Sequence, residues 1–453
     1  MARVNARELA LKVLYAVEQE KAYASLALDR VLEHYHPDKL DRSFATELAY
    51  GVLRHLNTLD WLLEHFLRQP LASQNPWIRN ILRLGAYQIM YMDRVPDAAA
   101  CNESSELARR YGYSGAVGFV NGVLRNVARR GRQISFPDLH DDPVAHIALR
   151  YSHPTWLVQR WLKEYGIKET IALCEANNSP APNTVRTNTL KVGRQELIER
   201  LRGEGIAAEP VPFAPEGLKI SGFPSLHGFA PFKEGLFLVQ DESSILVGHA
   251  LSPFPGARVL DVAAAPGTKT THLAQLMEDR GKIIALDIHP HKIKLIAENC
   301  SRLGVTCVQP VLADARYPDQ DLHQWADFIL LDVPCSGLGV LRRRPDARWR
   351  KTEDSIKEMA CLQKEILEGA ARCLKPGGVM VYSTCTVTRE ENLGQVEDFL
   401  SRHPEFHLED LTGILPAGLD KQGTLARGYI QLLPHRHGMD GFFIARLRKR
   451  ACP

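Results

Sequence analysis

From about residue 245 onward, short apolar runs alternate with stretches of helical periodicity, and this alternation is the strongest constraint on the fold. The runs are residues 258–262, 282–287, 305–311, 328–332 and 379–383. Apolar runs of this length separated by helices are typical of a parallel sheet with crossover helices. Few polar residues interrupt them, which indicates strands covered on both faces. We therefore expect an α/β domain over residues 241–453.

The first part of the chain has a different periodicity. Apolar residues recur at the spacing of one helix face, as in Val120, Val123 and Val127. A stretch rich in Pro and Asp at residues 137–143 then indicates a domain boundary. Mixed strand and helix patterns follow as far as Gln240. The sequence predicts an all-α domain over residues 1–140, a small α+β module over residues 145–240, and the α/β domain.

Composition excludes several classes of protein. The 453 residues are 45% hydrophobic and 24% charged, as in average soluble proteins, and the formal charge of +3 is too small to indicate a partner. The sequence shows neither a secretory leader nor an uninterrupted membrane span, so we expect a cytoplasmic protein with no membrane partner. Nine cysteines without a Cys-x-x-Cys pair suggest neither disulfides nor a metal site.

The loop after the first apolar run has the features of a small-ligand site, because ligands of α/β sheets bind beyond the carboxyl ends of strands. Gly267 lets the backbone approach a ligand, and the N–H groups that start the next helix can bind a carboxylate, such as the methionine end of S-adenosylmethionine. NAD normally requires three spaced glycines, and a P-loop requires Gly immediately before Lys269. Both are disfavoured. The candidate cofactor residues of this loop are Ala263, Ala264, Ala265, Pro266, Gly267, Thr268 and Lys269.

Acidic residues follow the next strands in the same way. Asp287 ends the second strand about 20 residues after Gly267, where an acid commonly binds ribose hydroxyls. Asp314 follows the third strand and is placed to serve the adenine side. Asp332 ends the fourth strand and fits hydrogen bonding to a cytosine edge. Their shared position at strand ends favours a cofactor and substrate site over isolated turn residues.

Two cysteines follow neighbouring strands: Cys335 in a Pro-Cys pair and Cys385 in a Thr-Cys pair. Carbon 5 of cytosine is too weakly nucleophilic to attack a sulfonium unaided, but a thiolate that adds to carbon 6 activates it. A second group must then remove the proton from carbon 5. The residues alone leave open which cysteine attacks.

These motifs resemble the RsmB family, also called Sun or Fmu, of bacterial small-subunit ribosomal RNA cytosine-5 methyltransferases. The resemblance covers nearly the whole chain. It rests on the cofactor loop, the Asp332 to Gly337 segment, and the Tyr382 to Cys385 segment with Glu390, Glu391 and Asn392. Further matching pieces are residues 343–346 with Trp349, residues 374–378 and residues 440–443.

The resemblance implies a NusB-like N-terminal RNA-binding domain, an RNA-associated middle module and a seven-stranded, Rossmann-like class I methyltransferase domain whose last strand is antiparallel. It implies S-adenosylmethionine as cofactor, bound by Ala263 to Lys269, Asp287, Asp314 and Asp332. It also implies 16S ribosomal RNA as partner, Cys385 as nucleophile and Cys335 as the group that assists release. The sequence departs from the family at Ala263, usually Cys, and at Thr268, usually Gly.

Two clusters of arginine are candidate RNA contacts, because phosphate binding depends on local cationic groups. One consists of Arg125, Arg129 and Arg130, away from the apolar face of their helix. The other is the run of arginines between residues 342 and 350, of which Arg343 and Arg344 are the leading candidates.

Two alternatives remain open from the residues. One is an RNA-binding or assembly factor with an inert catalytic domain, which the paired cysteines and strand-end acids disfavour. The other keeps the chemistry and changes the substrate to transfer RNA or another ribosomal site. Neither the target nucleotide nor the oligomeric state can be predicted from this pattern.

Overall fold

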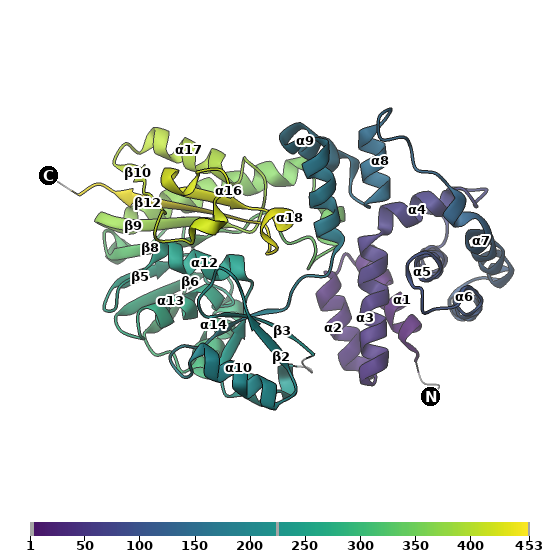
Figure 1. Ribbon diagram of the computed structural model, residues 1–453, viewed down its shortest axis with the longest axis horizontal. Helices are drawn as coiled ribbons and strands as arrows, with labels where there is room; N and C mark the ends of the chain where they lie inside the picture. Colours follow the sequence, from purple (N-terminus) through teal and green to yellow (C-terminus); the bar gives the residue numbers. More distant parts are fainter. Residues whose placement is uncertain (1–3, 223–225, 452–453) are drawn as a thin grey trace. The chain divides into compact units, whose positions relative to one another are not determined.

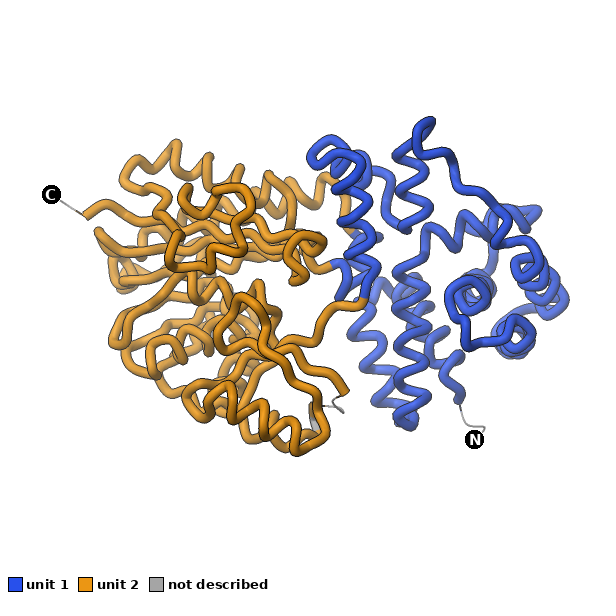
Figure 2. The backbone as a smooth tube through the Cα atoms, viewed as in Figure 1, with its two compact units in different colours: residues 1–179, 341–350 blue, residues 180–340, 351–453 orange. Residues whose placement is uncertain are grey.

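The computed structural model describes residues 4–222 and 226–451 and divides into two compact units. Unit 1 consists of residues 1–179 and 341–350, and unit 2 of residues 180–340 and 351–453 (Figure 2). This division differs from the three domains expected from the sequence. The segment 145–179 lies in unit 1, and the small sheet shares unit 2 with the large one.

Unit 1 is helical, which confirms the expected all-α N-terminal fold. Amphipathic helices enclose one core in which Leu59, Leu84 and Leu124 are fully buried. Local capping fixes the first helix, since the side chain of Asn5 accepts a hydrogen bond of 2.9 Å from the N–H of Glu8. Its principal helices are α1 (Ala6–Gln19), α2 (Ala24–Tyr35), α3 (Lys39–Arg54), α4 (Leu56–Glu64), α5 (Pro76–Tyr91), α6 (Asp97–Tyr111) and α7 (Ala116–Arg130).

Helices α8 (Pro143–Arg150) and α9 (Thr155–Asn178) also pack within unit 1. The side-chain amide of Asn57 donates to the carbonyl of Ala148 at 2.9 Å, and the backbone N–H of Asn57 donates to Ser152 Oγ at 3.1 Å. The Pro- and Asp-rich stretch before α8 is therefore a loop inside this unit. Asp142 within it caps α8 by accepting from the N–H of Ala145.

Unit 2 begins with a four-stranded antiparallel sheet in the order β2-β3-β1-β4. The strands are β1 (Thr184–Thr187), β2 (Ala207–Pro210), β3 (Gly217–Ser221) and β4 (Phe237–Val239), with helix α10 (Arg194–Gly203) between β1 and β2. Leu197 and Leu201 of α10 are buried in the same core as Val185 and Leu218 of the sheet. This confirms the expected α+β middle module.

The large sheet of unit 2 has the strand order β10-β12-β9-β8-β5-β6-β7, with β11 paired to β12. The five predicted apolar runs form its parallel core: β5 (Arg258–Asp261), β6 (Lys282–Asp287), β7 (Val308–Leu312), β8 (Ala326–Asp332) and β9 (Leu374–Thr384). The last strand, β12 (Phe442–Lys449), is antiparallel to β9, as expected. Strands β11 (Tyr429–Leu432) and β10 (Phe406–Leu408) pair with successive halves of β12, so eight strands fill seven positions.

Helices cover both faces of this sheet, as the unbroken apolar runs predict. Val259, Ile283 and Leu330 face one core with helices α12 (Glu242–Leu251), α13 (Thr268–Leu276) and α14 (Pro290–Leu303). The next residues along the same strands, such as Leu260 and Leu331, face a second core with α16 (Glu353–Cys373) and α17 (Leu393–Arg402) (Figure 1). This alternation gives the three-layered, doubly wound α/β fold.

Among the described residues, no helix is both long enough and apolar enough to span a bilayer.

Candidate active site

The thiols of Cys335 and Cys385 lie side by side, with 3.3 Å between their sulfur atoms. They meet because β8 and β9 are parallel neighbours in which Asp332 pairs with Ser383, so the two loops leave the sheet at the same edge. Both side chains are partly buried. The hydrogen bond with Cys385, burial, and the charges of Cys385 and Glu391 raise the pKa of Cys335. The pair can therefore lose one proton and share the other between the two sulfur atoms more easily than it can lose both protons.

Asp332 connects the cysteine loops to the candidate cofactor loop. Its carboxylate accepts hydrogen bonds from Lys269 Nζ at 2.6 Å and from Ser383 Oγ at 3.0 Å. The Lys269 ammonium also lies 4.9 Å from the ring centroid of Phe442, within range of a cation–π contact. The predicted residues Lys269 and Asp332 are thus in direct contact, and Asp332 is held as an oriented acceptor beside the thiols.

The loop 263–269 has the backbone form that a close ligand approach requires. Gly267 is left-handed, with φ of +93°, and a Cβ there would lie 3.3 Å from the backbone of Ile296. The N–H of Ala264 donates to the carbonyl of Leu286, which ties the loop to β6. Thr268 begins α13, and its carbonyl accepts from Arg186 at 2.6 Å. Since Gly267 supplies the left-handed turn, Thr268 in place of the family's Gly introduces no positive φ.

Asp261 lies beneath this loop as a fully buried acid. One oxygen accepts from Thr270 Oγ1 at 2.6 Å, and the carboxylate also faces the backbone N–H of Ala263 at the start of the loop. Burial, reinforced by the charge of Asp332, raises the pKa of Asp261 to about 7. Asp261 and the left-handed Gly267 together hold the loop backbone at this strand end, where a polar ligand of an α/β sheet binds.

Asp287 and Asp314 follow the neighbouring parallel strands β6 and β7. Asp287 is 7% exposed and accepts from the N–H of His289 at 3.0 Å. Asp314 is held by the guanidinium of Arg316 at 2.8 Å, and these hydrogen bonds lower the pKa of Asp314. The strand order therefore places Asp314, Asp287, the cofactor loop, Asp332 and the thiols in sequence along one edge of the sheet.

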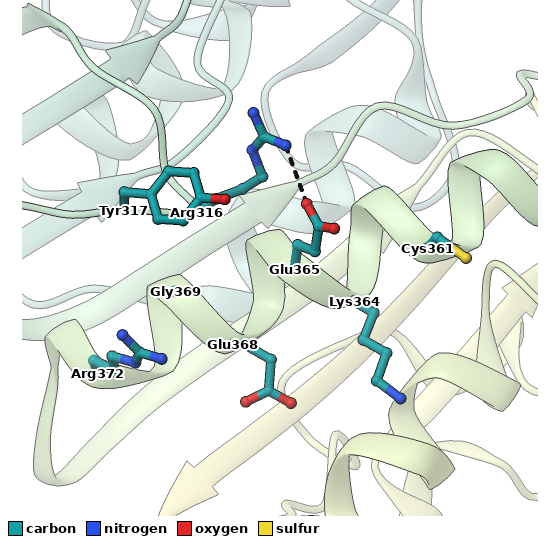
Figure 3. A pocket seen from close by; sticks show the side chains of 8 residues that line it. All are labelled: Arg316, Tyr317, Cys361, Lys364, Glu365, Glu368, Gly369 and Arg372. Carbon is teal, nitrogen blue, oxygen red and sulfur yellow. Dashed lines mark hydrogen bonds and ion pairs between the residues drawn. The ribbon is translucent and has the colours of Figure 1, made fainter.

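A surface hollow adjoins the Asp314 end of this edge. Arg316, Tyr317 and Cys361 contribute to its lining (Figure 3). Arg316 bridges Asp314 to Glu365 of α16, 3.1 Å away. The bridge fixes the orientation of Asp314, and Tyr317 remains 74% exposed beside it.

The candidate RNA-binding residues of α7 are on the surface of unit 1. Arg125, Arg129 and Arg130 are all exposed, whereas Val123 and Val127 of the same helix are buried. Their guanidinium groups are therefore accessible to phosphates, as the periodicity predicts.

The arginine run 342–350 requires a partial correction. Arg343 is partly buried and Arg344 is exposed, so both remain candidate RNA contacts. Arg348 is fully buried within unit 1, where it donates to Ser152 O at 2.9 Å and Asn178 Oδ1 at 2.8 Å. Arg350 donates to the carbonyls of Lys21 and Ala22. The expectation that the whole run faces phosphates is wrong at Arg348, whose NH1 and NH2 groups donate to protein oxygens, and at Arg342, which is 5% exposed.

Two buried clusters could not be found from sequence spacing. In one, the carboxylate of Glu391 accepts hydrogen bonds from Ser336, Thr388 and Gln363. Glu391 belongs to a family motif, but Ser336 lies 55 positions earlier in the chain. In the other, the donor atoms of Glu216, His249 and His272 lie within 4.8 Å of one another, as metal ligands could. Burial, reinforced by the nearby Arg186 guanidinium, lowers the pKa of His272 to about 4, so neutral His272 can share Glu216 with His249.

The fold and the site define the class of protein. A doubly wound sheet with acids and a glycine turn along its carboxyl edge, in a chain that also has a helical N-terminal unit, is a Rossmann-like methyltransferase architecture. Family models agree: "16S rRNA methyltransferase RsmB/F" matches residues 248–448, "NusB family" matches residues 4–129, and "Methyltr_RsmF/B-like, ferredoxin-like domain" matches residues 153–227. The chain belongs to the RsmB/F methyltransferase family.

Individual relatives support this membership over the full length. The chain is 39% identical to "Probable ribosomal RNA small subunit methyltransferase B" of Bacillus subtilis, covering 99% of this chain and 100% of that protein. A Synechocystis protein of the same description is 38% identical, over 98% and 100%. The crystal structure of PH0851 has a TM-score of 0.81 and 30% identity, covering 98% and 99%. That of NSun6 from Pyrococcus horikoshii with SFG has a TM-score of 0.59 and 29% identity, covering 65% and 98%.

Proposed function

We propose that this protein transfers a methyl group from S-adenosylmethionine to carbon 5 of a cytosine in 16S ribosomal RNA through a covalent bond between Cys385 and carbon 6. The observation that carries the proposal is the 3.3 Å pair of thiols beside Asp332, next to the candidate cofactor loop. Its relatives are described as ribosomal RNA small subunit methyltransferases, which supports the substrate. We place this activity in the cytoplasm.

The cofactor residues fit S-adenosylmethionine by their chemistry. The N–H groups that begin α13 suit its carboxylate, Asp287 suits the ribose hydroxyls, and Asp314 suits the adenine side. NSun6, a structural neighbour, was solved with SFG, an analogue of S-adenosylmethionine. When bound, the cofactor supplies an electrophilic methyl group on a sulfonium.

The residues of the chain account for the other steps. The Cys385 thiolate adds to carbon 6, and the displaced electron pair makes carbon 5 nucleophilic. Asp332, held by Lys269 and Ser383, hydrogen bonds the cytosine edge and orients the ring. Once Cys385 is bonded to carbon 6, the Cys335 thiol releases its own proton to water. After carbon 5 carries the methyl group, the Cys335 thiolate removes the carbon 5 proton and becomes a thiol again. The electrons of that C–H bond restore the ring double bond as the carbon–sulfur bond breaks, and Cys385 leaves as a thiolate.

The test is methylation of purified 16S and transfer RNA by the full chain, with bisulfite mapping of each product. We expect one new 5-methylcytosine in 16S RNA and none with Cys385→Ala. If transfer RNA were methylated and 16S RNA were not, the substrate would be transfer RNA. Methylation of neither RNA, despite binding, would favour the RNA-binding factor with an inert catalytic domain.

A further inference from the structure

Glu391 is fully buried in the loop between β9 and α17, and its carboxylate reaches back to the other cysteine loop. It accepts from the backbone N–H of Ser336 at 2.7 Å and from Ser336 Oγ at 2.6 Å. Ser336 directly follows Cys335. One side chain from the Cys385 loop therefore fixes the backbone that carries the opposite thiol.

Gln363 of α16 holds the other side of Cys335. Its Nε2 donates to the carbonyl of Pro334 at 2.9 Å and to Glu391 at 3.2 Å. Thr388 Oγ1 completes the set around Glu391 at 2.6 Å. The donors that these bonds bring to the carboxylate are an amide, a backbone N–H and two hydroxyls, all neutral. They satisfy its lone pairs without bringing a positive charge to it.

This arrangement imposes an asymmetry on two chemically identical groups. Two thiols 3.3 Å apart do not both ionise readily, so one S–H is expected to donate to the other sulfur as a thiolate. A buried carboxylate disfavours a second anion beside it because the local dielectric is low. The hydrogen bond with Cys385, burial, and the charges of Cys385 and Glu391 raise the pKa of Cys335, and the Gly337 N–H lowers it. Tyr382 is another titratable neighbour: its hydroxyl donates to the Glu391 carbonyl, and burial with the charges of Cys335 and Glu391 raises its pKa. On the other side of the thiols, Asp332 is paired with Lys269.

We propose that Glu391 is a positioning residue that sets the order of ionisation: it keeps Cys335 as a thiol whose S–H donates to a Cys385 thiolate. The inference deepens the proposed function, on which its catalytic meaning rests. It supplies a reason within this structure for Cys385 to be the nucleophile, which the spacing of the two cysteines leaves open.

The experiment is alkylation of the full chain with iodoacetamide over a series of pH values, without RNA or cofactor, with each cysteine quantified by mass spectrometry. In alkylation the thiolate sulfur bonds to carbon and iodide leaves, so each rate follows the thiolate fraction. We expect Cys385 to react at lower pH than Cys335. The exposed Cys361 is the internal reference.

Glu391→Gln removes the charge, and Glu391→Asp keeps it while shortening the reach. We expect the Gln variant to alkylate Cys335 about ten-fold faster at neutral pH, which corresponds to a midpoint lower by about one pH unit. The Asp variant is expected to change absolute rates without moving that midpoint. The exposed neighbour gives the matched control, Glu390→Gln, which should behave as the unmodified protein does.

Earlier reaction of Cys335 in the unmodified protein would overturn the inference, and that measurement requires no variant to fold. A folded Glu391→Gln protein with an unchanged Cys335 midpoint would also overturn it. Because alkylation uses neither RNA nor cofactor, its result is separate from the methylation assay. The methylation assay can therefore contradict the proposed function while alkylation supports the order of ionisation, and alkylation can contradict that order while methylation is observed.

Discussion

The ammonium of Lys269 lies 2.6 Å from the carboxylate of Asp332, so the loop after β5 is joined to the end of β8 by an ion pair. The Lys269 side chain is 9% exposed and that of Asp332 is 29% exposed. A substitution of either residue is therefore expected to disturb both the cofactor loop and the loops that carry the thiols.

Replacement of Lys269 by Met should leave Asp332 without its cationic partner and lower the free energy of unfolding by about 1–3 kcal/mol, below the range for a fully buried pair. Urea denaturation measures this loss. The Lys269→Met, Asp332→Asn double variant should recover part of it, because no lone charge remains. Additive losses in the double variant would show that the pair is not coupled.

Replacement of either cysteine by Ala should separate their roles. Cys385→Ala cannot add to carbon 6 and should give neither product nor a covalent complex. Cys335→Ala should add and transfer methyl, then accumulate as a protein–RNA adduct because the carbon 5 proton is not removed. Denaturing electrophoresis with labelled RNA and S-adenosylmethionine distinguishes the two. An adduct with Cys385→Ala and none with Cys335→Ala would exchange the roles and leave the reaction class unchanged.

Asp287→Ala should weaken binding of S-adenosylmethionine about ten-fold or more, because hydrogen bonds to a charged group contribute roughly 1.5–3 kcal/mol. Calorimetry on the full chain measures the affinity. Asp319→Ala, which removes an exposed acid beyond β7, is the control and should bind as before. If both variants bound S-adenosylmethionine with the same affinity, Asp287 would not be the residue that binds its ribose.

The arginines of α7 should contribute salt-dependent RNA affinity. Gln at Arg125, Arg129 and Arg130 together should weaken binding and reduce the slope of log K against log salt by up to about 2–3, at about 0.7–0.9 per lost phosphate contact. The matched control replaces three exposed arginines of unit 2: Arg280, Arg372 and Arg427. If both triple variants lose the same slope, α7 has no special role in binding.

Asp261 should make stability depend on pH in a defined direction. Its pKa is about 7 when folded, above the ordinary 3.8, because burial favours the protonated form. Its contribution is therefore complete below about pH 4 and is lost as pH rises through 7, by an order of a few kcal/mol. Urea titrations at pH 5 and pH 8 should show a smaller difference for Asp261→Asn than for the unmodified protein. An equal difference would mean that Asp261 is ionised at both pH values.

The sheet and its edge were predictable because strand alternation is a local property. Val259 and Leu260 are adjacent in one strand and their side chains pack into opposite cores, as the alternation of a strand requires. The parallel order of the strands then brings Asp287, Asp332 and Cys385 to one edge of the sheet. Arg348 was not predictable in the same way. In sequence, a buried arginine whose NH1 and NH2 groups donate to protein oxygens looks the same as a solvated one.

Glu391 was missed for a related reason. Its motif places it near Cys385, but its hydrogen bonds are to the loop of Cys335, which only the pairing of β8 with β9 brings close. The assignment of residues 145–179 to unit 1 likewise depends on carbonyl contacts such as that of Asn57 with Ala148. Such polar contacts between distant segments leave no periodicity in the chain.

The segment 341–350 begins six residues after Cys335, yet it belongs to unit 1, where Arg348 fills a polar socket and the Trp349 indole donates to Leu53 O at 2.7 Å. The helical unit is therefore not a contiguous gene segment. A fragment that ends at Ser179 would lack the residues that satisfy these carbonyls, and a fragment that starts at Pro180 would carry an arginine with no socket. The two units therefore cannot be exchanged as independent modules by simple fusion at one junction.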